Sequence, residues 1–219
     1  MKQPLLDFDY ENTLPEDHKH FNIFDEFNIP KILESITSHC YHLLYPTKKF
    51  LFPVITQIKV CLKEIEPPAY ASGDKKKVIC VSPDYFARFK KFNDLEFELK
   101  GVLCHEITHC IQYSCSHFGF VEGLADFIRL KCLYIPKHWK RSFIKWDNGY
   151  DGTAYFLEWL DEQYPSSVLE INQRCKSEWS DLFFLEVTKK PIGILWKDYC
   201  REVGNRQVDI DLVKNKEYC

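Results

Sequence analysis

The chain has 219 residues, of which 45% are apolar, 16% aromatic and 28% charged. This composition can bury enough surface to offset the entropy lost on folding, which excludes a disordered, collagenous or low-complexity protein. Lys and Arg number 29 against 32 Asp and Glu, and the net charge of −3 excludes a bulk positive field that would attract nucleic acid or acidic membranes. We therefore predict one globular domain over residues 1–219, monomeric, with neither a nucleic acid nor a membrane as its partner.

The sequence also bears on location. No run of eighteen apolar residues occurs, and Asp7, Asp9 and Glu11 interrupt the segment where a signal peptide needs a hydrophobic stretch. We therefore expect a cytoplasmic protein. The ten cysteines contain no C-x-x-C pair, so we expect most of them to be buried, reduced thiols rather than a disulfide framework.

The N-terminal third favours a small sheet. Residues 1–27 are acidic and aperiodic and predict an extended arm held to the body by its aromatic side chains. A helix is expected from Asn28 to Pro46, where apolar residues recur at helical spacing. Residues 54–62 alternate with period two and residues 78–81 are uniformly apolar, which predicts two strands.

The sequence pattern predicts mainly helices in the rest of the chain. Asp94 is a candidate N-cap for the first of these helices, and Pro191 and Gly204 are expected to open and close the last. The expected helices span residues 94–113, 120–133, 153–164, 166–175 and 191–203. The fold class predicted is α+β, a small N-terminal sheet packed on a mostly helical remainder.

The segment His105-Glu106-x-x-His109 lies inside the first of these helices. Residues four apart share a helix face, so both imidazoles can bind one zinc ion, with Zn–N distances of about 2.0–2.1 Å. Glu106 borders the same pocket and can accept a proton from a metal-activated water. The sequence therefore predicts that this helix carries a catalytic metal site.

The best candidate for a third ligand is Glu122, in the first turn of the next expected helix. Asp126 lies one turn further on the same face, which suits a carboxylate that accepts the second ring N–H of His105. Two histidines and one carboxylate leave a fourth position open, as in catalytic zinc sites. Asp126 itself and His117 remain alternatives for the third ligand.

Three cysteines also lie near the motif: Cys104, Cys110 and Cys115. A thiolate ligand would make the donor set of the metal site softer and could fill its open coordination position. Neither Cys104 nor Cys110 shares a helix face with both histidines, so we expect these thiols to pack the inner side of the helix. Gln112, Asp151 and Arg129 lie near the motifs without an assigned role.

Several segments resemble the plant basic secretory protein family, a group of zincin-type metallopeptidase-like proteins. The likeness runs from about Val54 to Val203 and is carried by the strings HEITHCIQY, GFVEGLADFIRLK, WDNGYDGTAYFLEWL and DLFFLEVTKKPIGILWKDY. The resemblance implies a zincin-like fold, zinc ligands at His105, His109 and Glu122, and Glu106 as the base. It also implies an extracellular location as the alternative to the cytoplasm, although this chain is acidic and lacks an export signal.

We therefore predict a zinc metallopeptidase with one Zn²⁺ ion and a peptide or protein substrate. The alternative is a zinc-containing binding or defence-like protein of the same fold with little turnover. Tyr150 is a candidate donor to the oxyanion of a tetrahedral intermediate, or else packs with Trp146 in a glycine-flanked turn. The strand at residues 78–81 is expected to align an extended substrate by edge pairing.

Overall fold

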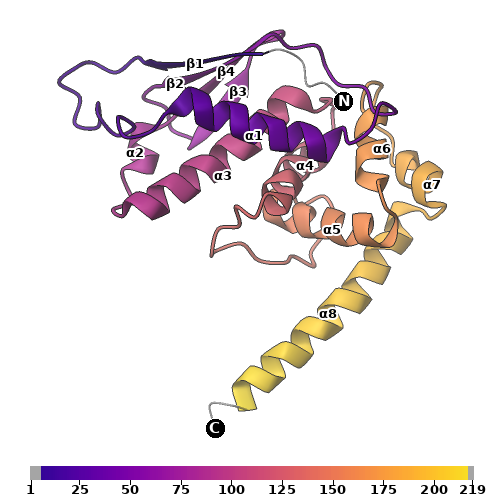
Figure 1. Cartoon of the computed structure of the whole chain (residues 1–219). Helices are drawn as coiled ribbons and strands as arrows, with labels where there is room; N and C mark the ends of the chain where they lie inside the picture. The colour runs from indigo at the N-terminus through magenta and orange to yellow at the C-terminus, as the bar shows by residue number, and fades with distance from the viewer. Residues whose placement is uncertain (1–5, 217–219) are drawn as a thin grey trace. The chain divides into compact units, whose positions relative to one another are not determined.

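The computed structural model describes residues 6–216, with side chains described through Gly204. It confirms the α+β class: within these residues a small sheet is followed by a mostly helical chain (Figure 1). Two compact units can be distinguished. The first contains the described residues up to Ser114 together with Ile128–His138, and the second contains Cys115–Phe127 and the residues from Trp139 onward.

The first unit contains a four-stranded sheet formed by β1 (Asp7–Asn12), β2 (Gln57–Leu62), β3 (Ala69–Ser72) and β4 (Lys76–Val81). The strand order is β1-β2-β4-β3, with β1 and β4 parallel to β2, and β3 antiparallel to β4. The expected edge pairing of a substrate along residues 78–81 is therefore wrong, because β4 is paired on both sides. The short β3, between Pro68 and Gly73, takes the edge position and was not predicted.

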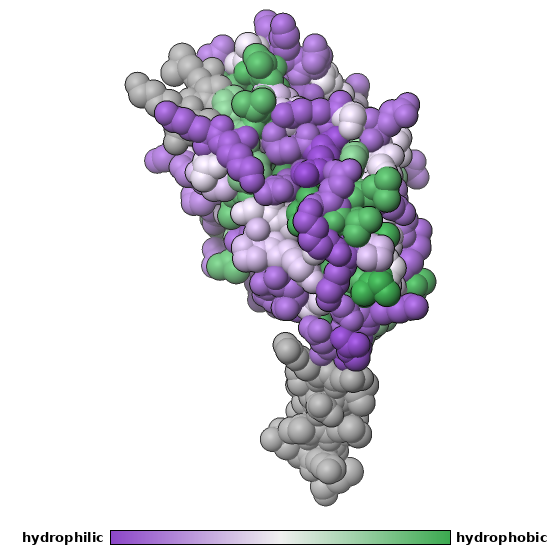
Figure 2. Space-filling model, turned by 90° about the vertical axis from the view of Figure 1, so that its right-hand side faces the viewer, coloured by the Kyte–Doolittle hydropathy of each residue, from purple (hydrophilic) through white to green (hydrophobic). Residues whose placement is uncertain are grey.

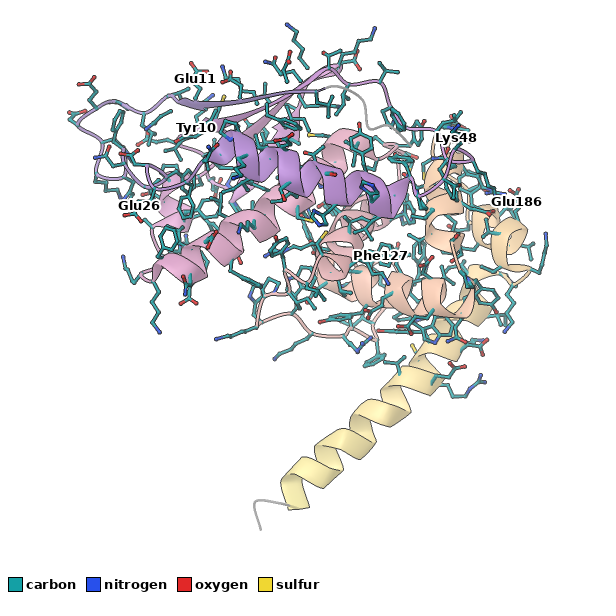
Figure 3. The ribbon with its side chains drawn as sticks, viewed as in Figure 1. Tyr10, Glu11, Glu26, Lys48, Phe127 and Glu186 are labelled. Atoms are coloured by element: carbon teal, nitrogen blue, oxygen red, sulfur yellow. The ribbon has the colours of Figure 1, made fainter. Side chains whose placement is uncertain are left out.

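The N-terminal arm provides the other edge of the sheet. Its residues 7–12 pair with β2, so the arm is a sheet strand as well as an extended segment. Tyr10 faces α1 and Glu11 faces away from it (Figure 3). Burial raises the pKa of Tyr10 to about 12. On the outer face, Lys59 bonds the Glu11 carboxylate at 2.5 Å, so the solvent side of the sheet is polar.

Two helices cover the inner face of the sheet: α1 (Ile29–Leu44) and α3 (Phe92–Ile111) (Figure 1). The side chain of Asn28 caps α1 by accepting a hydrogen bond from the Lys31 amide, as the sequence predicted. The predicted cap of α3 is wrong, because that helix starts after Lys91 and Asp94 lies in its first turn. In that position the negative charge of Asp94 still interacts favourably with the positive end of the helix dipole. The short helix α2 (Pro83–Phe86) precedes α3.

A buried ion pair ties α3 to the last turns of α4 (Phe118–Lys131). Arg129 on α4 bonds the Glu98 carboxylate of α3 at 3.1 Å and the Tyr134 carbonyl at 2.9 Å. Tyr85 donates to the other oxygen of Glu98 at 2.7 Å. The guanidinium lies directly on Gly101, since a Cβ at that position would be 2.6 Å from Arg129 Nη2. Both charges are therefore compensated inside the first unit.

We expect Gly101→Ala to lower the free energy of unfolding by about 1–3 kcal/mol, because the new methyl group forces Arg129 out of its hydrogen bonds. The matched control is Gly193→Ala, where an added Cβ meets nothing within 4 Å. That change should leave stability unchanged or raise it by up to about 1 kcal/mol, since alanine is the better helix former. Urea unfolding of the two variants measures the difference, and equal stabilities would contradict this account of Gly101.

The second unit is built from α5 (Tyr150–Gln163), α6 (Ser167–Arg174), α7 (Leu182–Thr188) and α8 (Ile192–Lys216). The prediction that Gly204 closes the last helix is wrong, since α8 continues to Lys216. A C-terminal glycine stops a helix by adopting a left-handed conformation, and the glycines with positive φ among the described residues are Gly73 and Gly149. Gly204 therefore stays helical. Helix α7 was not predicted, because the helix is only seven residues long.

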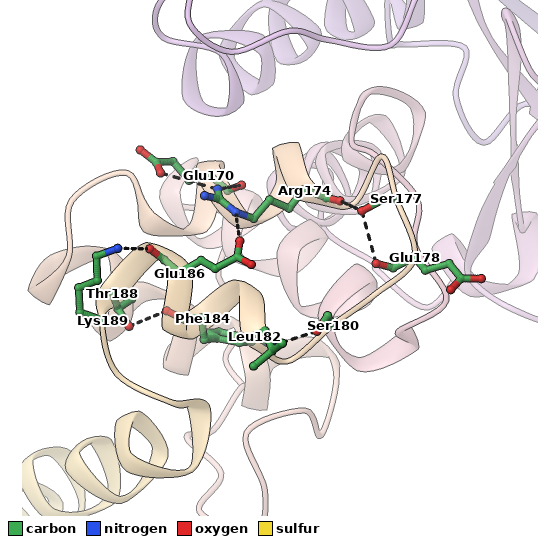
Figure 4. Close-up of polar contacts among 10 residues, drawn as sticks. All are labelled: Glu170, Arg174, Ser177, Glu178, Ser180, Leu182, Phe184, Glu186, Thr188 and Lys189. Atoms are coloured by element: carbon green, nitrogen blue, oxygen red, sulfur yellow. Dashed lines mark hydrogen bonds and ion pairs between the residues drawn. The ribbon is translucent and has the colours of Figure 1, made fainter.

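Aromatic rings and polar contacts hold the second unit together. Its core rings are Trp146, Phe156, Trp179, Phe184 and Tyr199, with neighbouring centroids 5.0–6.4 Å apart. On the surface, Arg174 of α6 bonds the Glu186 carboxylate of α7 at 3.0 Å (Figure 4). Thr188 closes α7 by donating to the Phe184 carbonyl at 2.7 Å.

The surface is mixed in character. Figure 2 shows hydrophobic groups scattered among hydrophilic ones on the side that carries α6 and α7. Among the helices of the described part, none is both long enough and apolar enough to cross a lipid bilayer.

Candidate functional site

The two histidines of the motif face one another on α3. His105 is 9% exposed and Glu106 is 6% exposed. The Nε2 atoms of His105 and His109 are 2.9 Å apart, and the rings cross at 86°. Two nitrogens bound to one zinc ion at the tetrahedral angle lie about 3.4 Å apart, so a small rotation of the rings brings both to ligand distance. The pair therefore fits a metal ion.

Gln112 lies beside this pair, at the C-cap of α3. The structure places the Nε2 nitrogen of its side-chain amide 2.9 Å from Nδ1 of His109. An amide can present either its oxygen or its nitrogen to a neighbour. With the oxygen facing His109, Nδ1–H donates to it and the lone pair of Nε2 faces His105, which is the tautomer that a metal ligand needs. Sequence reasoning named Gln112 without giving it a role, because the residue lies outside the motif.

Glu122 lies on α4, two turns before Arg129 and on the same face of that helix. Arg129 bonds Glu98 on α3, and Glu98 lies two turns before His105. One donor atom from each of His105, His109 and Glu122 lies within 4.8 Å of the other two. Two imidazoles and one carboxylate are the ligand types found in catalytic zinc sites.

Asp126 occupies the next turn of α4 and is only 3% exposed. Glu122 and Asp126 therefore share one face of the helix, as their spacing predicted. A buried carboxylate needs a hydrogen-bonding partner, and the ring N–H of a histidine is a suitable one.

His117, the alternative ligand, has another set of partners. Its Nδ1 accepts a hydrogen bond from the Phe120 amide at 3.2 Å, which caps the start of α4. Its Nε2 is 3.5 Å from the Asp147 carboxylate, and its ring stacks on Trp146 with centroids 5.0 Å apart. These contacts use both nitrogens of the ring, which favours Glu122 over His117 as the third ligand.

Tyr150 and Trp146 have different surroundings. Trp146 belongs to the aromatic core of the second unit, whereas Tyr150 is 48% exposed at the first position of α5. Tyr150 contacts Phe118 with ring centroids 6.2 Å apart. The preceding Gly149 lies against Glu122, because a Cβ on it would be 4.0 Å from the Glu122 Cβ. Tyr150 thus begins α5 next to a residue that touches a candidate ligand.

The cysteines follow the expectation in part. All nine within the described residues are free thiols, and six of them are buried, including Cys104 and Cys110. Cys115 is half-buried. Cys219 lies outside the described residues.

The chain was compared with known proteins in three ways. Neither the search of curated proteins nor the search of solved structures found a match. The model of the BSP family, described as "peptidase of plants and bacteria", matches residues 3–199. This match covers the segment from His105 to His109 and nearly the whole chain, and it confirms the resemblance seen in the sequence: the chain belongs to the BSP family of plant and bacterial peptidases.

Proposed function

We propose that this protein is a zinc-dependent peptidase. The observation that carries the proposal is the convergence of one donor atom each from His105, His109 and Glu122 within 4.8 Å. The family description as a peptidase supports the same reaction class. Two imidazoles and a carboxylate leave one tetrahedral position open, which is typical of catalytic rather than structural zinc.

Zinc bound to these residues would lower the pKa of a water molecule and polarise the scissile carbonyl. Glu106 then acts as the general base, since it follows His105 directly and is buried at the same end of α3. It accepts a proton from the attacking water and passes that proton to the leaving amine. A buried carboxylate next to an open coordination position has no purpose in a closed structural site.

Three further residues support this chemistry. Asp126 accepts the second ring N–H of His105, and Gln112 accepts that of His109, so both rings are held in the tautomer that binds metal. Tyr150 donates its phenolic proton to the developing oxyanion of the substrate. Removing such a donor typically costs about 2.7–4 kcal/mol of transition-state stabilisation.

The sheet suggests how a peptide would bind. Strand β3 is an edge strand that pairs only with β4 among the described strands, and it packs beside α3, which carries the motif. An extended peptide can add to such an edge through main-chain hydrogen bonds. We therefore propose that the substrate binds along β3 instead of the predicted residues 78–81.

Metal content tests the ligand set. We expect the purified protein to hold one equivalent of zinc at the His/His/Glu site, and Glu122→Gln to lose it, because a neutral amide is a poor zinc ligand. His117→Ala is the matched control and should keep the metal, since His117 caps α4 instead. Retention in Glu122→Gln together with loss in His117→Ala would overturn this ligand set. A zinc-loaded wild type that cleaves no peptide in a diverse library would favour the binding-protein alternative.

A further inference from the structure

Three cysteines that are far apart in the sequence meet inside the first unit. Cys40 lies on α1, Cys104 lies on α3, and Cys132 follows the last residue of α4. Their sulfur atoms all lie within 4.8 Å of one another, and Sγ of Cys40 is 3.7 Å from Sγ of Cys104. Cys40 and Cys104 are fully buried, whereas Cys132 is half-buried. The peptidase chemistry proposed above uses none of these thiols.

The spacing of the sulfurs fits one metal ion. Two thiolates at about 2.3 Å from a zinc ion, at the tetrahedral angle, lie about 3.8 Å apart. A disulfide would need an S–S distance of about 2.05 Å and would leave the third thiol unused. The cluster of three thiols therefore fits one shared metal ion better than it fits a single S–S bond.

The surroundings of the cluster also suit a soft cation. The Thr108 hydroxyl donates to the Cys104 carbonyl at 2.8 Å and lies 4.0 Å from Sγ of Cys40, so it borders the cluster. The partial exposure of Cys132 gives an ion a route from solvent.

We propose that Cys40, Cys104 and Cys132 form a second metal site, a three-thiolate site for a soft divalent d¹⁰ cation of the zinc and cadmium class. Thiolate sulfur selects such ions over magnesium or calcium. Cys104 and His105 are successive residues and point about 100° apart around α3, so the two sites use different sides of the helix. An ion here cross-links α1, α3 and the end of α4. It would stabilise the helix that carries the histidines without taking part in hydrolysis.

The test uses Cd²⁺, because its bonds to thiolates give a charge-transfer absorption that histidine and carboxylate ligands lack. Titration of the reduced full chain should give this band at one equivalent, with an intensity that corresponds to three thiolates. Cys40→Ser, Cys104→Ser and Cys132→Ser should each lose at least a third of it. Cys110→Ser is the matched control, a buried thiol on the same helix, and should keep the full band.

Two further variants separate this site from others. His105→Ala/His109→Ala should keep the band, so a failure of the proposed peptidase site leaves this result unchanged. Cys115 and Cys175 form a second pair of neighbouring thiols, in the other unit. Cys115→Ser therefore tests whether that pair contributes to the band, and we expect the band to be kept. A band that disappears in Cys115→Ser or in the histidine variant, or no band at all, would overturn the proposal.

A measurement on the wild type does not depend on whether a buried serine is tolerated. Cd²⁺ should slow alkylation of Cys132 by iodoacetamide at least tenfold, as followed by mass spectrometry. Cys200 is the internal control, since it is also half-buried but lies on α8 in the second unit. Equal alkylation rates of Cys132 with and without Cd²⁺ would show that these thiols bind no ion.

Discussion

Glu106→Gln should lower the rate of peptide hydrolysis by about 10²–10⁴-fold while the zinc content stays that of the wild type, because the amide cannot accept a proton from water. The substitution keeps the size of the side chain, and Glu106 is not one of the three metal donors. Hydrolysis of a peptide library by the zinc-loaded wild type and variant, with metal analysis of both, measures the effect.

The matched control is Glu96→Gln. Glu96 lies on the same helix but outside the motif. Its carboxylate bonds Lys100, which is one helical turn further along, at 2.7 Å. That variant should cleave at the wild-type rate. If Glu106→Gln and Glu96→Gln were equally active, Glu106 would have no part in the chemistry and the peptidase proposal would fail.

Glu98→Ala should lower the free energy of unfolding by about 3–5 kcal/mol, since it leaves the Arg129 charge buried without its partner. Both side chains of this pair are less than one tenth exposed, at 7% for Glu98 and 8% for Arg129. The Tyr85 hydroxyl also loses its acceptor. Urea unfolding followed by tryptophan fluorescence would measure the change, and Glu98→Gln should give a smaller loss.

Glu186→Ala serves as the comparison, because it breaks the exposed pair with Arg174 across α6 and α7. Exposed pairs contribute about 0–1 kcal/mol, so this variant should remain close to wild type. Equal losses from the two substitutions would mean that burial of the Glu98–Arg129 pair has no energetic consequence.

Local patterns in the sequence were sufficient for much of this fold. The apolar spacing of residues 29–44 predicted α1, and the period of two predicted the core of β2. The His105–His109 spacing predicted a shared helix face because four residues make about one helical turn. In each case the signal lies within one segment, and its physical cause is local.

The features that were missed depend on contacts between distant segments. Strand β1 pairs with residues fifty positions away, as Asp7 does with Gln57, and its own alternation is carried by only two aromatic residues, Phe8 and Tyr10. Helix α8 passes through Gly204 because glycine terminates a helix only when the backbone turns left-handed there. The cluster of Cys40, Cys104 and Cys132 requires three segments to be placed together, so no spacing in the sequence could indicate it.

The position of β1 at the edge of the sheet has a consequence for the handling of this protein. Strand β1 covers the hydrogen-bonding side of β2 along its whole length, from Asp7↔Gln57 to Asn12↔Leu62. Cleavage after Asn12 would remove that cover and leave a row of backbone donors and acceptors open to other chains. Uncovered strands of this kind template aggregation. Residues 7–12 therefore protect the protein against self-association, in addition to any part they play in folding.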